Sequence, residues 1–301
     1  MFNVFVKATG FVLVVILGFI LKKIKVLEKK DGNTLATIIM NITLPCALLS
    51  NANGMVVNAA MIGLILIGVF SNVFIVIVGF FLDQDALKKG MFMINCSGYN
   101  IGNFVLPFVE TFFPGMGVAY LCMFDIGNAL MGLGGTYAIA GSVANSQDKL
   151  TFKSVCKKLF SSIPFDVYII LFILALFQIK VPAPVLSIST FIGSGNGFLA
   201  MLMIGLMLEI KVSASEIKDV LKILITRIGF NSLFMLVCYF LLPFPLLARK
   251  ILVLALAAPL STVSAVFSKK IGYYRDAPAI ANSMSIIISI VELTVLIMLF
   301  V

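Results

Sequence analysis

A few polar side chains stand inside long apolar stretches, and their types suit solute binding and proton transfer. Asp125 follows an apolar run and precedes Asn128, whereas Asn100 and Asn103 interrupt another apolar stretch and Glu292 lies well inside the last one. An ionisable group in hydrocarbon costs at least about 2.5 kcal/mol, so a functional role is its default interpretation. Amides can donate to and accept from a carboxylate-bearing solute. We therefore expect Asp125 and Glu292 to couple a proton or a cation to solute binding.

Each of these residues also has a structural interpretation. Asp125 would be satisfied in place by neighbouring amides or by the N-terminus of a helix. Ser261 and Thr262 would join the free N–H groups of a helix that starts nearby, or bond back to their own helix. Glu110 lies near the outer end of its stretch, where it can reach the membrane interface, and a structural role is expected for it.

The sequence excludes several kinds of chemistry. It contains no histidine, which removes Ser-His and Cys-His catalysis and the usual zinc sites. No Gly-x4-Gly-Lys-Ser/Thr loop is present, so the chain is not expected to bind ATP. The five cysteines have no metal-type spacing and are predicted to be free thiols. We predict that the chain is not an enzyme and needs no metal or other cofactor.

The elements that hold these residues are predicted to be transmembrane helices. Of 301 residues, 61% are hydrophobic and only 12% are charged, far below the roughly 25% expected of a soluble domain. A helix needs about 20 apolar residues to cross a bilayer. We predict an all-α integral membrane protein with ten spans, near residues 4–21, 34–50, 59–82, 89–112, 117–141, 164–179, 186–208, 220–242, 250–268 and 279–301.

The fourth and ninth spans each contain an interruption near the middle. The polar run 95–103 separates residues 91–94 from 104–113, and Pro259 separates 251–258 from 260–267. Proline suits the first position of a helix, so Pro259 is predicted to begin the second half-helix. A spanning helix can unwind only beside protein or water. Each half-helix N-terminus carries roughly +0.5 of a charge, and two such ends at mid-membrane would favour an anion. The alternative is that these residues merely kink ordinary spans.

Positive charge divides unevenly between alternating loops. One set holds 17 lysines and arginines and the other holds four, namely Lys7, Lys180, Arg249 and Lys250, with Arg227 inside a span. Cytoplasmic loops carry the excess of positive charge. The rich set is Lys22, Lys23, Lys25, Lys29, Lys30, Lys88, Lys89, Lys149, Lys153, Lys157, Lys158, Lys211, Lys218, Lys222, Lys269, Lys270 and Arg275. This division predicts a multi-pass protein of the cell membrane with both termini outside.

The chain divides into two nearly equal halves. Residues 1–141 and 164–301 each hold five predicted spans, and the Lys-rich segment 142–163 is predicted to be a cytoplasmic linker. Because five is odd, the second half must enter the membrane from the opposite side. If the halves share a fold they form an inverted repeat, and the interrupted helix is the fourth of each.

Four short motifs carry a resemblance to a known family. They are Asn100 followed by Leu106-Pro107, the run Phe124-Asp125-Ile126-Gly127-Asn128, the run Ala257-Ala258-Pro259, and the run Thr43-Leu44-Pro45. With these motifs the chain resembles the auxin efflux carrier family, whose bacterial members include malate permease-type carriers. Plant members have a proline at the first interruption, where this chain has Tyr99.

The resemblance implies two inverted five-helix repeats, a crossing of the fourth and ninth helices at the substrate site, and a homodimer. It also implies that spans one, two, six and seven form a scaffold for the others. On this chain the candidate substrate-binding residues are Pro45, Asn100, Ile101, Gly102, Asn103, Asn128, Ala258, Pro259, Leu260, Ser261 and Thr262.

These features predict a secondary transporter of a small organic anion, such as the dicarboxylate malate, working by alternating access of the elevator or rocking type. Proton or sodium coupling would pass through Asp125 and Glu292. Two alternatives stay open: a sodium-coupled symporter like the bile-acid transporters, and a membrane sensor that keeps the shape without transport. Its partners would be the solute, the lipid bilayer and a second copy, and nucleic acid is not expected.

Overall fold

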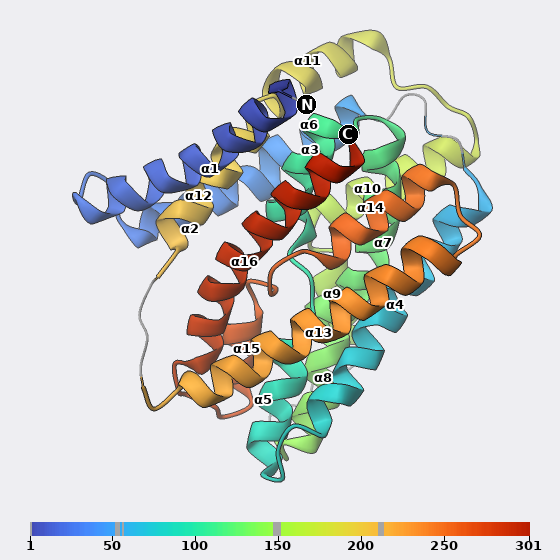
Figure 1. Ribbon diagram of the computed structural model, residues 1–301. Helices are drawn as coiled ribbons and strands as arrows, with labels where there is room; N and C mark the ends of the chain where they lie inside the picture. Colours follow the sequence, from blue (N-terminus) through green and yellow to red (C-terminus); the bar gives the residue numbers. More distant parts are fainter. Residues whose placement is uncertain (1, 52–54, 56, 147–151, 210–213) are drawn as a thin grey trace.

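The computed structural model describes residues 2–51, 55, 57–146, 152–209 and 214–301, and all regular structure within them is helical (Figure 1). The helices are α1 (Phe2–Lys23), α2 (Lys29–Ile38), α3 (Leu44–Ser50), α4 (Ala59–Phe80), α5 (Ala86–Cys96), α6 (Leu106–Phe112), α7 (Met116–Leu130), α8 (Thr136–Val143), α9 (Phe152–Leu159), α10 (Ile163–Leu176), α11 (Ala183–Gly193), α12 (Asn196–Met207), α13 (Ile217–Leu241), α14 (Leu246–Leu256), α15 (Ser264–Lys270) and α16 (Ala277–Phe300). Three π-helical turns, η1 (Ile39–Thr43), η2 (Ile101–Val105) and η3 (Met131–Gly135), join α2 to α3, lead into α6, and join α7 to α8.

Seven helices in the described residues are long and apolar enough to cross a membrane, as expected of a multi-pass membrane protein. They are Phe5–Lys23, Lys29–Ser50, Ala59–Phe80, Met116–Val143, Ala183–Met207, Ile217–Leu241 and Ala277–Phe300. Their outer faces expose large apolar side chains such as Leu13, Phe70 and Leu233, which suits contact with lipid. The three other predicted spans fall on shorter helices: α5 with α6, α10, and α14 with α15. The number ten stays a prediction.

The helices pack in two groups. In the first, α12 packs along α1 and α2, and α3 packs on α10 and α11. In the second, α4 packs on α5 and α7, α5 on α8 and α15, and α13 on α14 and α16. Figure 1 shows α1, α2 and α12 side by side, apart from α13, α4 and α8. The two larger cavities described below lie where the two groups meet.

Pairs of glycines let helices approach closely within each group. A Cβ on Gly205 of α12 would overlap the carbonyl oxygen of Val15 in α1, and a Cβ on Gly127 of α7 would overlap that of Ile65 in α4. Small residues at such contacts are typical of membrane helices, because van der Waals packing rather than the hydrophobic effect holds the helices together. The close contact at Gly127 fixes the position of α7 against α4, and α7 carries Asp125 and Asn128.

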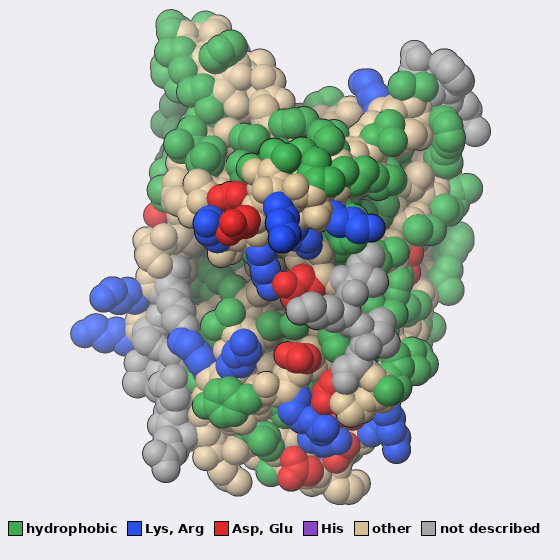
Figure 2. All heavy atoms as spheres, turned by 90° about the vertical axis from the view of Figure 1, so that its left-hand side faces the viewer, with side chains coloured by type: hydrophobic (Ala, Val, Ile, Leu, Met, Phe, Trp, Pro, Cys, Tyr) green, Lys and Arg blue, Asp and Glu red, His purple; other side chains and the backbone are tan. Residues whose placement is uncertain are grey.

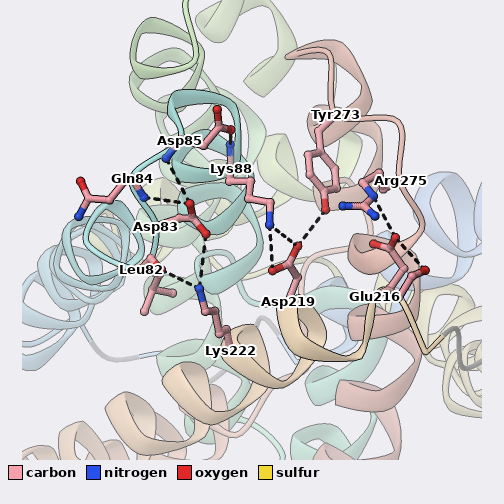
Figure 3. Close-up of polar contacts among 11 residues, drawn as sticks. Leu82, Asp83, Gln84, Asp85, Lys88, Glu216, Asp219, Lys222, Tyr273 and Arg275 are labelled. Carbon is pink, nitrogen blue, oxygen red and sulfur yellow. Dashed lines mark hydrogen bonds and ion pairs between the residues drawn. The ribbon is translucent and has the colours of Figure 1, made fainter.

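Two lysines and one arginine of the rich set pair with acidic groups on one face of the molecule. Lys88 lies 3.2 Å from Asp219, Arg275 lies 3.0 Å from Glu216, and Lys222 lies 3.4 Å from Asp83. Figure 3 shows these contacts joining the start of α5 and the loop before it to the start of α13 and to the loop before α16. Figure 2 shows charged side chains gathered on this side, with apolar ones above them.

Asp83 is held in its ionised form at this face. Burial alone would raise its pKa, but the N–H groups of Asp85 and Gln84 and the Lys222 ammonium outweigh burial and lower the pKa below its usual value. Lys211 and residues 147–151 of the predicted linker, which include Lys149, lie outside the described residues. Which side of a membrane this face meets stays a prediction.

Candidate functional site

The two interrupted stretches meet. Helix α5 ends at Cys96 and η2 begins at Ile101, whereas α14 ends at Leu256 and α15 begins at Ser264. Between them, Tyr99 and Leu260 form an antiparallel bridge, and the Asn100 N–H donates to the Pro259 carbonyl oxygen at 3.1 Å. Two short extended segments from distant parts of the chain therefore cross inside the helical bundle, and we call this contact the crossing.

The first interruption is shorter than the sequence indicated. Asn95 and Cys96 remain helical, and only residues 97–100 leave the helix before η2 begins. The Asn95 side chain explains this, because its Nδ2 donates to the Met91 carbonyl oxygen and to Ser268 Oγ, both at 2.8 Å. A polar residue that bonds back to the preceding turn does not break a helix.

The prediction that Pro259 begins the second half-helix is wrong. Residues 257–263 lie outside the helices and α15 starts at Ser264, so Ser261 and Thr262 precede α15 rather than forming its first turn. The extended course is stabilised by tertiary bonds, since the Leu260 N–H donates to Ser285 Oγ at 3.1 Å. Only the first of the two expected helix ends therefore opens into the main cavity described below.

Side-chain amides replace the missing helical partners of the first interruption. Asn128 pairs with the Tyr99 backbone in both directions, accepting from its N–H at 3.0 Å and donating to its carbonyl oxygen at 2.8 Å. Gly98, at φ +75°, donates to Asn72 Oδ1 at 2.6 Å. Buried backbone groups need such partners. Asn72 was not expected from the sequence, although an amide in the middle of the apolar helix α4 was a signal for it.

A cavity of about 120 Å³ lies beside the crossing, and we call it the main cavity because most of the predicted site residues line it. It is lined by residues of η1, η2, α7, η3 and α10 together with Ser261. Of the predicted site residues, Asn100, Ile101, Gly102, Asn103, Asp125, Asn128 and Ser261 line it. The structure thus brings together residues from both halves of the chain.

Asp125 accepts two hydrogen bonds at this cavity. Asn128 Nδ2 donates to its Oδ1 at 2.8 Å, and the Tyr168 hydroxyl donates to its Oδ2 at 3.0 Å. Tyr168 lies on α10, in the other group of helices, and its side chain is buried. Asn128 was an expected partner, whereas Tyr168 was not, because nothing in the local sequence distinguishes it from a core tyrosine.

Two amides at the cavity remain available to a solute. The Asn100 side chain forms no hydrogen bond with the residues that the structure describes, and Asn103 Oδ1 is buried without a described partner. The helical stretch Ile101–Phe112 also begins here. The Ile101 N–H donates to the Tyr99 carbonyl oxygen at 3.0 Å, whereas the N–H groups of Gly102 and Asn103 have no acceptor in a preceding helical turn. Donors and acceptors are therefore both present for a small polar solute.

A second cavity of about 150 Å³ touches Asn100 from another direction. It is lined by Thr262, by Met203 and other residues of α12 and α16, and by the ion pair of Lys29 with Glu209 at 2.9 Å. Asn100 therefore borders two cavities, both of which lie between the two groups of helices.

The other predicted site residues lie elsewhere. Ala258, Pro259 and Leu260 form the crossing itself without lining the main cavity, and Pro45 is buried in the first turn of α3. Glu292 lies apart from Asp125, beside a small cavity of about 20 Å³ that it shares with Arg227. All five cysteines are free, and the described residues contain no group of three acidic or cysteine side chains that could hold a metal.

No protein-family model matches the chain, and no curated protein matches it in sequence. Function is therefore argued from the geometry of this site.

Proposed function

We propose that the chain is a secondary transporter of a small organic anion, such as the dicarboxylate malate, which binds in the main cavity beside the crossing. One observation carries the proposal: two interrupted helical stretches touch at a buried point, next to a cavity lined by Asp125, Asn100, Asn103 and Asn128. Unwound backbone at this depth is tolerated in membrane proteins where it lines a cavity, and in transporters it marks the substrate site.

The chemistry of the cavity suits a hydroxy-acid anion. The N–H groups that follow Ile101 in the first turn of the Ile101–Phe112 helix, and the amides of Asn100 and Asn103, would donate to carboxylate oxygens. The unpaired Asn103 Oδ1 would accept from a hydroxyl group. Pockets for drug-sized ligands hold about 300–1,000 Å³, so a cavity of about 120 Å³ selects a much smaller solute.

Asp125 couples a proton to the anion in this proposal. Two like charges 4 Å apart repel by about 4 kcal/mol at an effective dielectric constant of 20. An ionised Asp125 would therefore oppose an anion in so small a cavity, and a proton taken up with the anion removes the repulsion. The Asn128 and Tyr168 donors hold the carboxylate when the site is empty.

Alternating access requires two bodies that move relative to each other, and the two groups of helices fit this requirement. Helices at corresponding positions of the two halves make the same contacts. The contact of α1 with α12 corresponds to that of α10 with α3. The contacts of α4 with α5 and with α7 correspond to those of α13 with α14 and with α16. This recurrence supports ten spans in two inverted repeats, residues 1–141 and 164–301. A homodimer in the cell membrane, with both termini outside, completes the proposal.

Counterflow in proteoliposomes tests the proposal. Vesicles loaded with unlabelled malate should accumulate labelled malate, and an inward proton gradient should drive uptake. A sensor would bind without exchange, a channel would show no counterflow, and a sodium symporter would need sodium. If no mono- or dicarboxylate exchanges, the proposed function is wrong.

The variant Asp125→Asn tests the coupling role. Exchange should persist while the response to a proton gradient disappears, because the amide cannot take up a proton. Asp276→Asn is the matched control, since Asp276 is exposed and lines neither the main cavity nor the second one. Unaltered proton-driven uptake by Asp125→Asn would remove Asp125 from the mechanism.

A further inference from the structure

Helix α13 presents two buried polar side chains to the crossing. Arg227 and Asn231 are four residues apart, which places them on one face of the helix. Both are almost fully buried, with 4% and 5% of their surface exposed. Asn231 Nδ2 donates to the carbonyl oxygen of Leu256, the last residue of α14, at 3.0 Å, and its Oδ1 accepts from the Tyr99 hydroxyl at 3.0 Å.

The guanidinium of Arg227 donates hydrogen bonds to carbonyl oxygens of both interruptions. Nη1 donates to Cys96, the last residue of α5, at 2.8 Å, and Nη2 donates to Ala258 at 3.0 Å and Pro259 at 3.2 Å. The guanidinium carbon also lies 4.7 Å from the centre of the Tyr99 ring, within range of a cation–π interaction. One cationic group thus joins two segments that are 131 and 31 to 32 residues away in sequence.

These carbonyls form a site that attracts a cation. The C-terminal end of a helix carries about half a negative charge, and its last carbonyls lack helical partners. In transporters with interrupted helices, such carbonyls coordinate the coupled ion, which is sodium or a proton. Here a permanently charged side chain already occupies them.

We propose that Arg227 is the resident cation of the crossing: it holds the two interruptions together and takes the place that a coupled sodium ion would occupy. Arg227 is therefore a positioning residue, and it acts on the solute through Tyr99 and Asn100. The inference rests on the proposed transport function. If Arg227 replaces the sodium ion, transport should be independent of sodium and should be coupled through Asp125 instead.

Thermal unfolding of the purified full-length protein tests the inference without a solute. Replacing sodium by choline at constant ionic strength should leave the Tm of the wild type unchanged. Arg227→Ala should lower the Tm by at least about 5 °C, because it strands the buried carbonyls of Cys96 and Ala258 and leaves that of Pro259 with the Asn100 N–H alone. Millimolar guanidinium should restore at least half of that loss, since the free ion can enter the place of the missing group.

Arg249→Ala is the matched control, because it deletes a guanidinium that donates to a single carbonyl, that of Tyr239, at 2.8 Å. Guanidinium should not raise its Tm. Arg227→Lys keeps the charge but cannot reach three carbonyls in the same geometry, so its Tm should fall between those of the wild type and Arg227→Ala.

The outcomes separate this inference from the proposed function. Stabilisation of the wild type by sodium over choline would overturn the role of Arg227, even if neither variant could be purified. Equal effects of guanidinium on Arg227→Ala and Arg249→Ala would overturn it as well. Absence of anion exchange would refute the transport proposal, whereas the unfolding results would still decide whether Arg227 is the resident cation.

Discussion

The Tyr168 hydroxyl connects the two groups of helices at Asp125. It donates from α10 to a carboxylate on α7 at 3.0 Å, and such bonds to charged groups contribute about 1.5–3 kcal/mol. If the groups move apart during transport, this bond must break. Tyr168→Phe should therefore speed exchange by about tenfold, the factor that corresponds to 1.4 kcal/mol. The half-time of labelled-malate exchange in proteoliposomes measures it.

Tyr273→Phe provides the control for this substitution. Its hydroxyl also donates to an aspartate, Asp219 Oδ2 at 3.4 Å, but donor and acceptor belong to the same group of helices. Its exchange rate should match the wild type. Exchange by Tyr168→Phe that is slower or unchanged would show that the bond does not restrain the moving interface.

At the scale of single residues, the sequence revealed the groups that stand out from their surroundings. Asn100, Asn103, Asp125 and Asn128 were identifiable because polar side chains are costly in apolar stretches, and the structure places all four at one cavity. Tyr168 could not be identified, because its role comes from a contact 43 residues away. Pro259 was misjudged for the same reason, since tertiary bonds to its neighbours override the local preference of proline for a helix start.

At the scale of elements, the contact of α4 with α7 sets the position of Asp125 and Asn128. Gly127→Ala would drive a methyl group into the Ile65 carbonyl and separate the two helices. Overpacking of this kind costs about 1–3 kcal/mol. We expect a lower Tm and weaker malate binding, measured by thermal unfolding with and without malate.

Gly229→Ala is the matched control for this change. Gly229 lies inside α13, and a Cβ there would meet nothing within 4 Å. Alanine is favoured over glycine in a helix by up to about 1 kcal/mol, so its Tm should stay level or rise. A similar loss in both variants would mean that the α4–α7 approach is not the cause.

Helix positions followed from the sequence more fully than helix irregularities did. Seven of the predicted spans fall on helices long enough to cross a membrane and the other three on shorter helices, because hydrophobic length constrains helix positions strongly. The three π-helical turns were not foreseen, yet each contributes to the main cavity: Met40 from η1, Gly102 from η2 and Gly132 from η3. Such turns are frequent at functional sites. They depend on the packing around them, which a single sequence does not display.

The predicted linker contains a helix that its polar composition did not indicate. Helix α9 lies in the segment interpreted as linker, and its lysines masked an apolar face. Val155 on that face packs against Gly134 of η3, where a Cβ would lie 2.6 Å from the valine side chain. The composition of a segment therefore did not decide whether it forms a helix.

At the scale of the whole molecule, the number of membrane spans and the division of positive charge between the loops together predict which side of the membrane each loop faces. Five predicted spans lie between Lys30 and Lys180, so the two positions should face opposite sides, with Lys30 inside because its loop belongs to the lysine-rich set. Both residues are exposed. In intact cells, a membrane-impermeant maleimide should label Lys180→Cys at once and Lys30→Cys only after permeabilisation. The unsubstituted protein gives the background from Cys46 and Cys156, which are partly exposed. Labelling of both variants from one side would require an even number of membrane spans between the two positions and would exclude the ten-span inverted repeat. Labelling of Lys30→Cys at once and of Lys180→Cys only after permeabilisation would keep ten spans and invert the orientation.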